Sequence, residues 1–343
     1  MWILTILDIK YRAIRFAVVT IGTALVFTLL FLMTGLIEQF NQEPFLMVER
    51  VSQSDWAVPE GTSGPFTSSS VIHPDQVEAL AGTPLLIARG TLEIDGEASE
   101  GIVVGAPASI LADVPLQDGA ATRGPLEAIV DMSTGLDVGS SFGLGGTDFT
   151  VVGLSEDTTL LAGQPAIFVD LQDARDAMFG GGDITMAVLV EPGRAPDVAG
   201  ITVLSADEVA EDALGPLENA VSSIDLIRVL LWVVAGIIIG AVVYLSALER
   251  HRDFAVLLAV GGRTRQLSLS LAIQAVFVAV VAVAIAAGLQ ALVVPVFPLK
   301  VRVPASALWQ VPLVAVVVSL LAASAAMRRV RRTDPAEAFG GPA

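Results

Sequence analysis

Residues 16–36 read FAVVTIGTALVFTLLFLMTGL, an uncharged stretch in which threonine and glycine are the polar interruptions. A helix needs about 20 such residues to cross the hydrocarbon core of a bilayer, which is about 30 Å thick. The stretch is longer than the apolar region of a secretory signal peptide, and no small-x-small cleavage site lies before Glu38. We therefore expect a retained membrane helix here.

Three later stretches have the same character. They are residues 226–248, 267–294 and 307–327. Their one charged side chain is Arg228, which is close enough to its helix end to reach the interface. Only 16% of the chain is charged, against about 25% in soluble domains, and 54% is hydrophobic. The expected fold class is a membrane α-helical protein with four transmembrane helices.

Lysine and arginine residues cluster at three places beside these spans. They precede the first span, separate the second from the third and follow the fourth: Lys10, Arg12, Arg15; Arg250, Arg252, Arg263, Arg265; Arg328, Arg329, Arg331, Arg332. Short loops rich in basic residues stay in the cytoplasm. Both termini (1–15 and 328–343) and the loop 249–266 are therefore expected there, in a multi-pass protein of the plasma membrane. Lys300 and Arg302, after the third span, point more weakly the other way.

The same topology leaves residues 37–225 and the short loop 295–306 outside the cell. The first segment holds 31 of the chain's 36 Asp and Glu residues, with five arginines and no lysine. Such acidity keeps a domain soluble and repels anionic headgroups. Apolar runs bounded by Gly, Pro and Asp predict strands at 85–89, 91–94, 101–104, 128–130, 149–152, 166–169 and 187–190. Helical signals at 74–81, 171–179 and 206–221 complete an α+β extracytoplasmic domain inserted after the first helix.

Most catalytic and metal-binding chemistry lacks its residues in this sequence. The chain has no cysteine, and His73, the only histidine of the outside segment, precedes a proline and is expected at the start of a helix. Gly143, Gly145 and Gly146 lack the spacing and the lysine of a phosphate-binding loop, so a hairpin turn is the better interpretation. Without a Walker A sequence the chain cannot hydrolyse ATP by that route. We expect no enzyme activity, no catalytic residue, no metal site, no cofactor of its own and no nucleic-acid partner.

Residues 248–265 read LERHRDFAVLLAVGGRTR. Charged residues leave the membrane first, an apolar patch follows, and two glycines end it. A short amphipathic helix of this composition can rest in the lipid headgroups, or it can dock into a groove of a partner protein. The composition leaves both alternatives open.

Four features occur here in an order typical of one family. The loop carries E-R-x-R-D-F-A-V-L-x-A-V-G from Glu249, and the tail carries R-T-D-P-A-E-A-F from Arg332. Residues 127–155 contain I-V-D-M-S, G-L-D-V-G and T-D-F-T-V-V-G-L. One span precedes the large domain and three follow it. Nearly the whole chain thus resembles the FtsX/MacB-type (type VII) ABC transporter permeases, closest to their DevC/HrtB-like branch.

This resemblance implies a permease subunit whose ATPase is a separate cytoplasmic chain that holds ATP and magnesium. It also implies a complex of two permeases and two ATPases that works by mechanotransmission, in which closure of the ATPases pushes the spans and the MacB-like outside domain to export a substrate. The coupling residues would be Glu249, Arg250, Arg252, Asp253, Phe254, Leu257, Leu258, Gly261 and Arg263. The amphipathic segment 1–15 would lie along the inner membrane surface.

The substrate that the resemblance implies is hydrophobic or amphipathic: haem, a lipid or a drug-like molecule. Four residues at or beyond the outer end of the first span are candidate haem ligands: Met33, Glu38, Glu43 and Met47. The plainer alternatives are membrane packing for the methionines and a solvated stalk for the glutamates. Gly236 and Gly240, in the second span, form a G-x-x-x-G pattern that allows close packing against a second copy of the permease.

Two other functions fit the same topology. An FtsX-like regulator would use the outside domain to activate a cell-wall hydrolase and would transport nothing. A sensor would bind a ligand outside and signal through the cytoplasmic loop to a kinase. The length of the outside segment favours the transporter, because FtsX outside domains are usually smaller.

Overall fold

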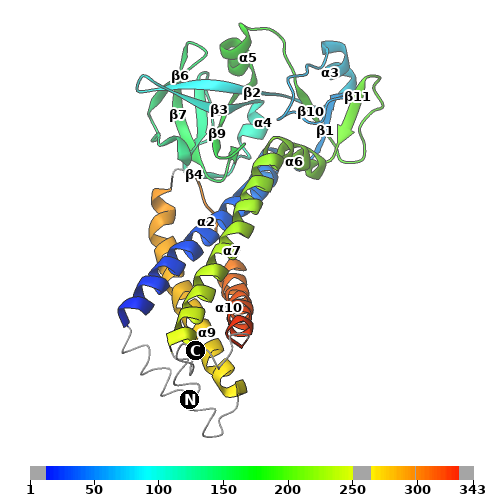
Figure 1. Cartoon of the computed structure of the whole chain (residues 1–343). Helices are drawn as coiled ribbons and strands as arrows, with labels where there is room; N and C mark the ends of the chain where they lie inside the picture. Colours follow the sequence, from blue (N-terminus) through cyan, green and yellow to red (C-terminus); the bar gives the residue numbers. More distant parts are fainter. Residues whose placement is uncertain (1–12, 250–263, 298, 332–343) are drawn as a thin grey trace, which may run out of the picture. The chain divides into compact units, whose positions relative to one another are not determined.

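A computed structural model describes residues 13–249, 264–297 and 299–331 of the chain. These residues divide into two compact units. The membrane unit contains the described residues up to Glu38 and from Ser222 onward, and the outside domain is Gln39–Val221. Each unit is described below by itself (Figure 1).

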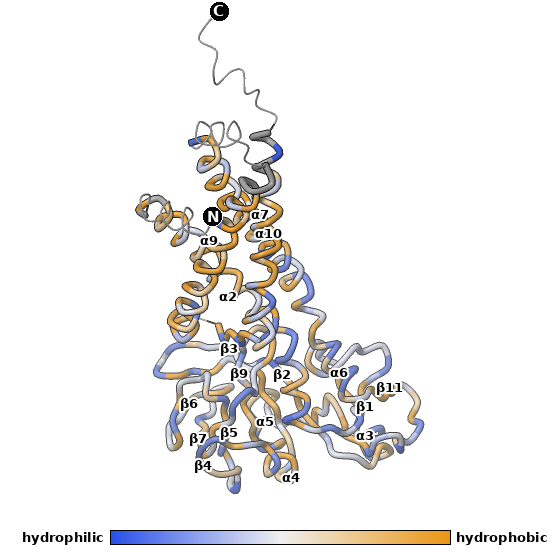
Figure 2. The backbone as a smooth tube through the Cα atoms, turned by 90° about the horizontal axis from the view of Figure 1, so that it is seen from below, coloured by the Kyte–Doolittle hydropathy of each residue, from blue (hydrophilic) through white to orange (hydrophobic). Residues whose placement is uncertain are grey.

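Within the described ranges, the membrane unit is built from helices α2 (Ala13–Val51), α7 (Glu218–Glu249), α9 (Thr264–Val293) and α10 (Ala307–Arg331), with a short 3-10 turn at Val294–Val296. These four helices are long and apolar enough to cross a membrane, and Figure 2 shows how continuous their hydrophobic character is. The prediction of four apolar helices, with a sheet-containing domain between the first and the second along the chain, is confirmed. The first helix does not end near Leu36, however, because apolar residues and helix formers carry α2 on to Val51.

Alanine is the commonest residue in the buried core of the membrane unit, where it packs beside large side chains such as Phe27 and Phe31. These alanines come from α2, α7, α9 and α10: Ala24, Ala235, Ala247, Ala275, Ala279, Ala282, Ala286, Ala307, Ala315 and Ala323. Other large apolar side chains face outward, including Leu25, Ile237 and Leu321, which are 55%, 64% and 63% exposed. Small residues at helix contacts with large residues turned to the surroundings are typical of helices that pack inside a lipid bilayer.

The loop after α9 packs closely on the outer end of the first span. A Cβ added to Gly35 would lie 2.6 Å from Cγ1 of Val301. The N–H of Arg302 donates a hydrogen bond to the carbonyl of Gly35 at 3.2 Å. Gly35 is therefore the residue that lets this outer loop lie against α2.

The outside domain is an α+β fold around one mixed sheet. Its strands are β1 (Asp55–Pro59), β2 (Thr83–Ile94), β3 (Glu97–Ala106), β4 (Leu116–Gly119), β5 (Glu127–Asp131), β6 (Ser141–Leu144), β7 (Thr147–Ser155), β8 (Thr159–Leu160), β9 (Gln164–Asp170), β10 (Ala187–Val190) and β11 (Ile201–Leu204). Their order is β11-β1-β10-β2-β3-β9-β5-β7-β4, with β6 against β2 and β7 and with β8 against β9. The helices are α3 (Pro74–Leu80), α4 (Ala108–Leu111), α5 (Leu171–Phe179) and α6 (Ala206–Leu214).

Every predicted strand of this domain lies in an observed strand, and the runs at 85–89 and 91–94 join into the single strand β2. The sequence did not predict β1, β4, β6, β8 or β11. The helix predicted over 206–221 is wrong in one respect, because α6 ends at Leu214 and a 3-10 turn at Gly215–Leu217 separates it from α7.

Two local predictions about turns are confirmed. His73 is the N-cap residue of α3. Gly145 and Gly146 form the two-residue turn of the β6–β7 hairpin, with φ of 58° and 81°. Positive φ at both central residues is what a type I′ hairpin turn requires, and glycine adopts it at little cost.

The main core of the outside domain receives helices from both ends of the domain. Met47, Val48 and Val51 of α2 pack in the same buried cluster as Val209 and Ala213 of α6. Sheet residues such as Trp56 and Phe168 complete that cluster. The chain therefore enters and leaves this domain through one shared hydrophobic core.

Candidate functional site

Glu43 is a carboxylate that α2 carries into the interior of the outside domain. Glu43 is 1% exposed. The carboxylate accepts hydrogen bonds from Thr159 Oγ1 at 2.6 Å, from the Ala162 N–H at 3.1 Å and from Gln39 Nε2 at 3.3 Å. A single side chain thus ties α2 to the turn between β8 and β9, which we call the Glu43 turn (Thr159–Gly163).

The backbone of the Glu43 turn is shaped to receive this carboxylate. Leu161, Ala162 and Gly163 have φ of 54°, 70° and 93°. A non-glycine residue in the left-handed region costs about 1 kcal/mol or more. The N–H of Ala162, in the middle of this turn, donates a hydrogen bond to the Glu43 carboxylate.

Burial and hydrogen bonding act in opposite directions on Glu43. Loss of solvent raises the pKa of the Glu43 carboxyl above its ordinary value, because burial penalises the charged form. Hydrogen bonds from Thr159, from Gln39 and from the Ala162 and Gly163 amides lower the pKa of the same group, but the effect of burial is larger. The net effect is a raised pKa, so the environment of Glu43 favours the protonated carboxyl over the charged carboxylate.

The I-V-D-M-S motif supports this arrangement from the other side. Asp131, at the end of β5, accepts hydrogen bonds from the N–H and the Oγ1 of Thr158, both at 2.9 Å. It also accepts from the Ser133 N–H at 2.9 Å. Thr158 immediately precedes the residue that binds Glu43. The motif is therefore structural in this fold, and it fixes the start of the Glu43 turn.

The four predicted haem ligands divide between the two units, and their role as ligands stays a prediction. Met47 is completely buried in the main core of the outside domain, and Glu43 is occupied by its three partners. Met33 and Glu38 are half-buried on the part of α2 that belongs to the membrane unit. The description of Glu43 as part of a solvated stalk is wrong, because α2 enters the domain core instead of ending before it.

Sequence reasoning missed the partners of Glu43, although one signal was present. Gln39, Glu43 and Met47 are spaced four residues apart, so they lie on one face of α2. That face is buried throughout. An uninterrupted helical pattern through the predicted stalk could have indicated that Glu43 points inward.

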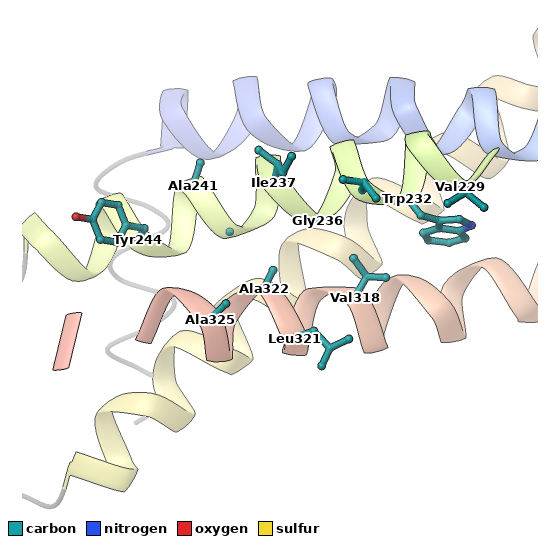
Figure 3. A pocket seen from close by; sticks show the side chains of 12 residues that line it. Val229, Trp232, Gly236, Ile237, Ala241, Tyr244, Val318, Leu321, Ala322 and Ala325 are labelled. Carbon is teal, nitrogen blue, oxygen red and sulfur yellow. The ribbon is translucent and has the colours of Figure 1, made fainter. Parts of the chain in front are cut away.

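A groove runs along α7 and α10 in the membrane unit (Figure 3). Its volume is about 820 Å³, and its lining is mostly apolar. Gly236 and Gly240 lie in it, where an added Cβ would meet Val318 Cγ1 at 3.1 Å and Ala322 Cβ at 3.5 Å. The two glycines therefore allow α7 and α10 of the same chain to approach closely. Packing against a second copy along this groove stays a prediction.

The predicted coupling residues lie at the C-terminal end of α7 and beyond it. Glu249 is exposed at the last position of α7. The others lie outside the described residues: Arg250, Arg252, Asp253, Phe254, Leu257, Leu258, Gly261 and Arg263. Among the described residues, no group of three or more His, Cys, Asp or Glu side chains could hold a metal ion.

Known proteins match this chain along its whole length. An uncharacterized ABC transporter permease of Mycobacterium tuberculosis is 35% identical over 344 residues, covering 98% of both chains. A second uncharacterized ABC transporter permease of that species is 33% identical over the same coverage. The family model described as FtsX-like permease C-terminal matches residues 226–335, which include most of α7 and all of α9 and α10.

Two solved structures align with part of the chain. The periplasmic region of MacB from Actinobacillus actinomycetemcomitans aligns with a TM-score of 0.35 and 12% identity, over 47% of this chain and 92% of that chain. The extracellular domain of the noncanonic ABC-type transporter YknZ from Gram-positive bacteria gives 0.30 and 16%, over 49% and 92%. Scores this low support no conclusion by themselves. The full-length relatives and the FtsX-like match do, and by them this chain belongs to the FtsX/MacB-type ABC transporter permeases.

Proposed function

We propose that this permease is the membrane subunit of an exporter that is driven by a separate cytoplasmic ABC ATPase. Two permeases pair with two ATPases, and closure of the ATPases on ATP moves the outside domains through the spans. The observation that carries this proposal is α2, one uninterrupted helix from Ala13 to Val51 that contributes residues to both units. The substrate is moved outside the bilayer, so the spans do not have to form a pore.

The way α2 ends supports a mechanical role. Met47, Val48 and Val51 are buried in the outside domain, and Glu43 is bonded to the Glu43 turn. A helix held at several points over two turns transmits a displacement instead of rotating freely, because packed cores deform little. A push on the span would therefore reach the sheet of the outside domain.

The second connection is short and is held by the same core. Val209 and Ala213 of α6 pack in the cluster that holds the end of α2. Only the 3-10 turn Gly215–Leu217 separates α6 from α7. Both spans that flank the outside domain therefore lead into one rigid cluster, as a relay requires.

The membrane unit offers little to a polar substrate. Charged residues are absent from residues 16–36, 267–294 and 307–327. The groove along α7 and α10 is apolar over most of its lining. Polar and ionisable groups inside spans usually mark the path of a polar substrate or an ion. A hydrophobic or amphipathic cargo such as a lipid, a drug-like molecule or haem fits this unit better.

Docking of the ATPase is tested by changing the predicted coupling loop. Replacing Phe254 and Leu257 by Asp should abolish co-purification of the cognate ATPase, because the apolar face of the loop would then carry two charges. The control is Leu126→Asp, which places the same change on the surface of the outside domain, where Leu126 is 39% exposed with φ of 57°. Retention of the ATPase by the double variant would contradict docking through this loop.

A further inference from the structure

The outside domain contains a cavity of about 530 Å³ beside its main core. It lies between the segment Pro65–Val71, strands β2 and β3, and the C-terminal end of α5. Its volume is within the range of about 300–1,000 Å³ that small-molecule sites occupy. All of its lining residues belong to one compact unit.

The cavity has an apolar interior and a mouth of mixed polarity. The interior side chains Phe66, Ile87, Ile102 and Met186 are 6%, 4%, 2% and 5% exposed. At the mouth, Arg89 and Ser69 lie among the exposed side chains of Val71 and Phe179. A ligand with an apolar tail and a polar head would be buried tail first, with its head beside these exposed residues.

Arg89 is the cationic group at this mouth. It follows Ile87 by two residues on β2, so both side chains lie on the same face of the sheet. Arg89 is also directly opposite Ile102 of β3. The guanidinium group is therefore next to the apolar interior and not at a distant edge of the domain.

The guanidinium of Arg89 has no carboxylate partner among the described residues, although the domain is strongly acidic. Arg175 and Arg194 each form an ion pair, with Asp183 at 2.6 Å and Glu191 at 2.9 Å. The carboxylate nearest to Arg89 along the same face of β3, Glu100, instead accepts a hydrogen bond from Gln164 at 3.0 Å. An arginine that stays unpaired beside a cavity is a ready partner for an anionic group.

The geometry points to this cavity as a binding site for a single acyl chain with an anionic head, whose head meets Arg89 and whose chain lies against Phe66, Ile87 and Ile102. Met178 and Met186 also line the cavity. Methionine is flexible and adapts to ligands of different shape, which suits acyl chains of varied length. As the substrate class of the exporter, this assignment rests on the proposed function; as a binding site, it does not.

The wall of the cavity is bonded to the helix that leads into the second span. Thr67 Oγ1, in the segment Pro65–Val71, donates a hydrogen bond to the carboxylate of Asp212 on α6. A Cβ added to Gly64 would lie 2.5 Å from the same carboxylate. Thr67, which lines the cavity, is therefore bonded directly to α6.

Photolabelling of the full-length permease in lipid nanodiscs tests the site. The probe is palmitate that carries a diazirine on its chain, and hexadecanol with the same diazirine is its neutral counterpart. Both partition into the bilayer, so labelling of the spans serves as the internal reference. The acid should label peptides containing residues 65–71 and 178–186, and the alcohol should label them much less relative to the spans.

Substitution at Arg89 is the decisive variant. Arg89→Gln should lower labelling of the cavity peptides about tenfold, as expected when a charge-assisted hydrogen bond is lost. Arg123→Gln, which changes another exposed arginine of the domain away from the cavity, should leave it unchanged. Equal labelling by acid and alcohol, or full labelling of Arg89→Gln, would overturn the proposal.

Competition identifies the source of the anionic head. Excess dodecanoate or excess lysophosphatidate should reduce the cavity labelling, and the stronger of the two shows whether the natural head is a carboxylate or a lipid phosphate. Labelling that neither compound reduces contradicts the site. These experiments contain no ATPase, so failure of the binding site is distinguished from failure of the proposed ATP-driven export.

Discussion

Glu43 is the buried residue of α2 whose carboxylate bonds this helix to the Glu43 turn of the outside domain. In place of water, its buried carboxylate accepts hydrogen bonds from Thr159 Oγ1, the Ala162 N–H and Gln39 Nε2. A buried polar group without partners costs about 1–3 kcal/mol, so loss of this side chain leaves donors of the Glu43 turn unsatisfied. The contact contributes both stability and a fixed register between α2 and β8.

Removal of this side chain should destabilise the outside domain. We expect Glu43→Ala to lower the free energy of unfolding by about 2–4 kcal/mol, from unsatisfied donors and a new cavity. The matched change Glu49→Ala, at an exposed position of the same helix, should stay within about 0.5 kcal/mol of the parent chain. Thermal unfolding of the purified permease measures both. Equal effects of the two substitutions would show that Glu43 is not a specific anchor.

The ionisation of Glu43 gives a prediction with a definite sign. Because burial raises its pKa in the folded state, the stabilisation that Glu43 contributes is full below its ordinary value of 4.5. That stabilisation is lost as the pH rises through the raised pKa. The difference in melting temperature between the parent chain and Glu43→Ala should therefore be larger near pH 4.5 than at pH 8. A difference that is independent of pH would contradict a raised pKa.

The sequence predicted the conformation or position of a single residue only where neighbouring residues determine it. The turn at Gly145–Gly146 follows from two glycines between alternating residues, and the position of His73 follows from the proline after it. The burial of Glu43 does not follow from its neighbours, because its main partner Thr159 is 116 residues away. Arg89 likewise becomes a candidate binding residue only because the fold places it in one cavity with Phe66 and Ile102.

At the scale of elements, the proposed relay depends on α2, the helix that contributes residues to both units. Pro44 already removes one helical hydrogen bond in the segment that belongs to the outside domain. The helix nevertheless continues to Val51, where its apolar face is packed in the core. Its continuity is therefore maintained by tertiary packing more than by helix propensity.

Weakening α2 at Asn41 and Gln42 should uncouple ATP hydrolysis from export while the complex with the ATPase stays intact. The double variant Asn41→Gly, Gln42→Gly costs roughly 1 kcal/mol of local helix stability relative to the parent chain, and roughly 2 kcal/mol relative to the corresponding double alanine variant. We expect the complex with the ATPase to form and to hydrolyse ATP, while export from reconstituted vesicles is lost. Asn41→Ala, Gln42→Ala removes the same side chains but keeps the helix, and it should retain export. Export by the glycine variant at the normal rate would contradict transmission through α2.

Elements were predictable where their ends carry their own signals. Helix α5 has the predicted bounds 171–179, because Asp170 caps its start through the Gln172 N–H and Gly180 ends it in the left-handed region. By contrast, β1 pairs with both β10 and β11, and its short run Asp55–Pro59 ends in a proline, which argues against a strand. The run Ile201–Leu204 after Gly200 has the composition of a strand and could have indicated β11. The extension of α2 was missed for a related reason, since its packing partners are sheet residues far along the chain.

At the scale of the whole molecule, the account predicts a pair of permeases whose outside domains move when the partner ATPases bind ATP. The cysteine-free sequence allows one spin label per copy without other changes. Glu211 is exposed on α6, next to the link into α7, and Glu211→Cys places the label where the proposed movement arrives.

The most direct test is the distance between the labels of the two copies, measured by pulsed electron paramagnetic resonance in the complex with the ATPase. The account predicts a defined distance without nucleotide and a clearly different one when the ATPase is trapped with ATP. The Asn41→Gly, Gln42→Gly variant should lose this change while ATP still binds. An inter-copy distance that is the same in both nucleotide states, or the absence of any dipolar signal between copies, would contradict the proposed relay.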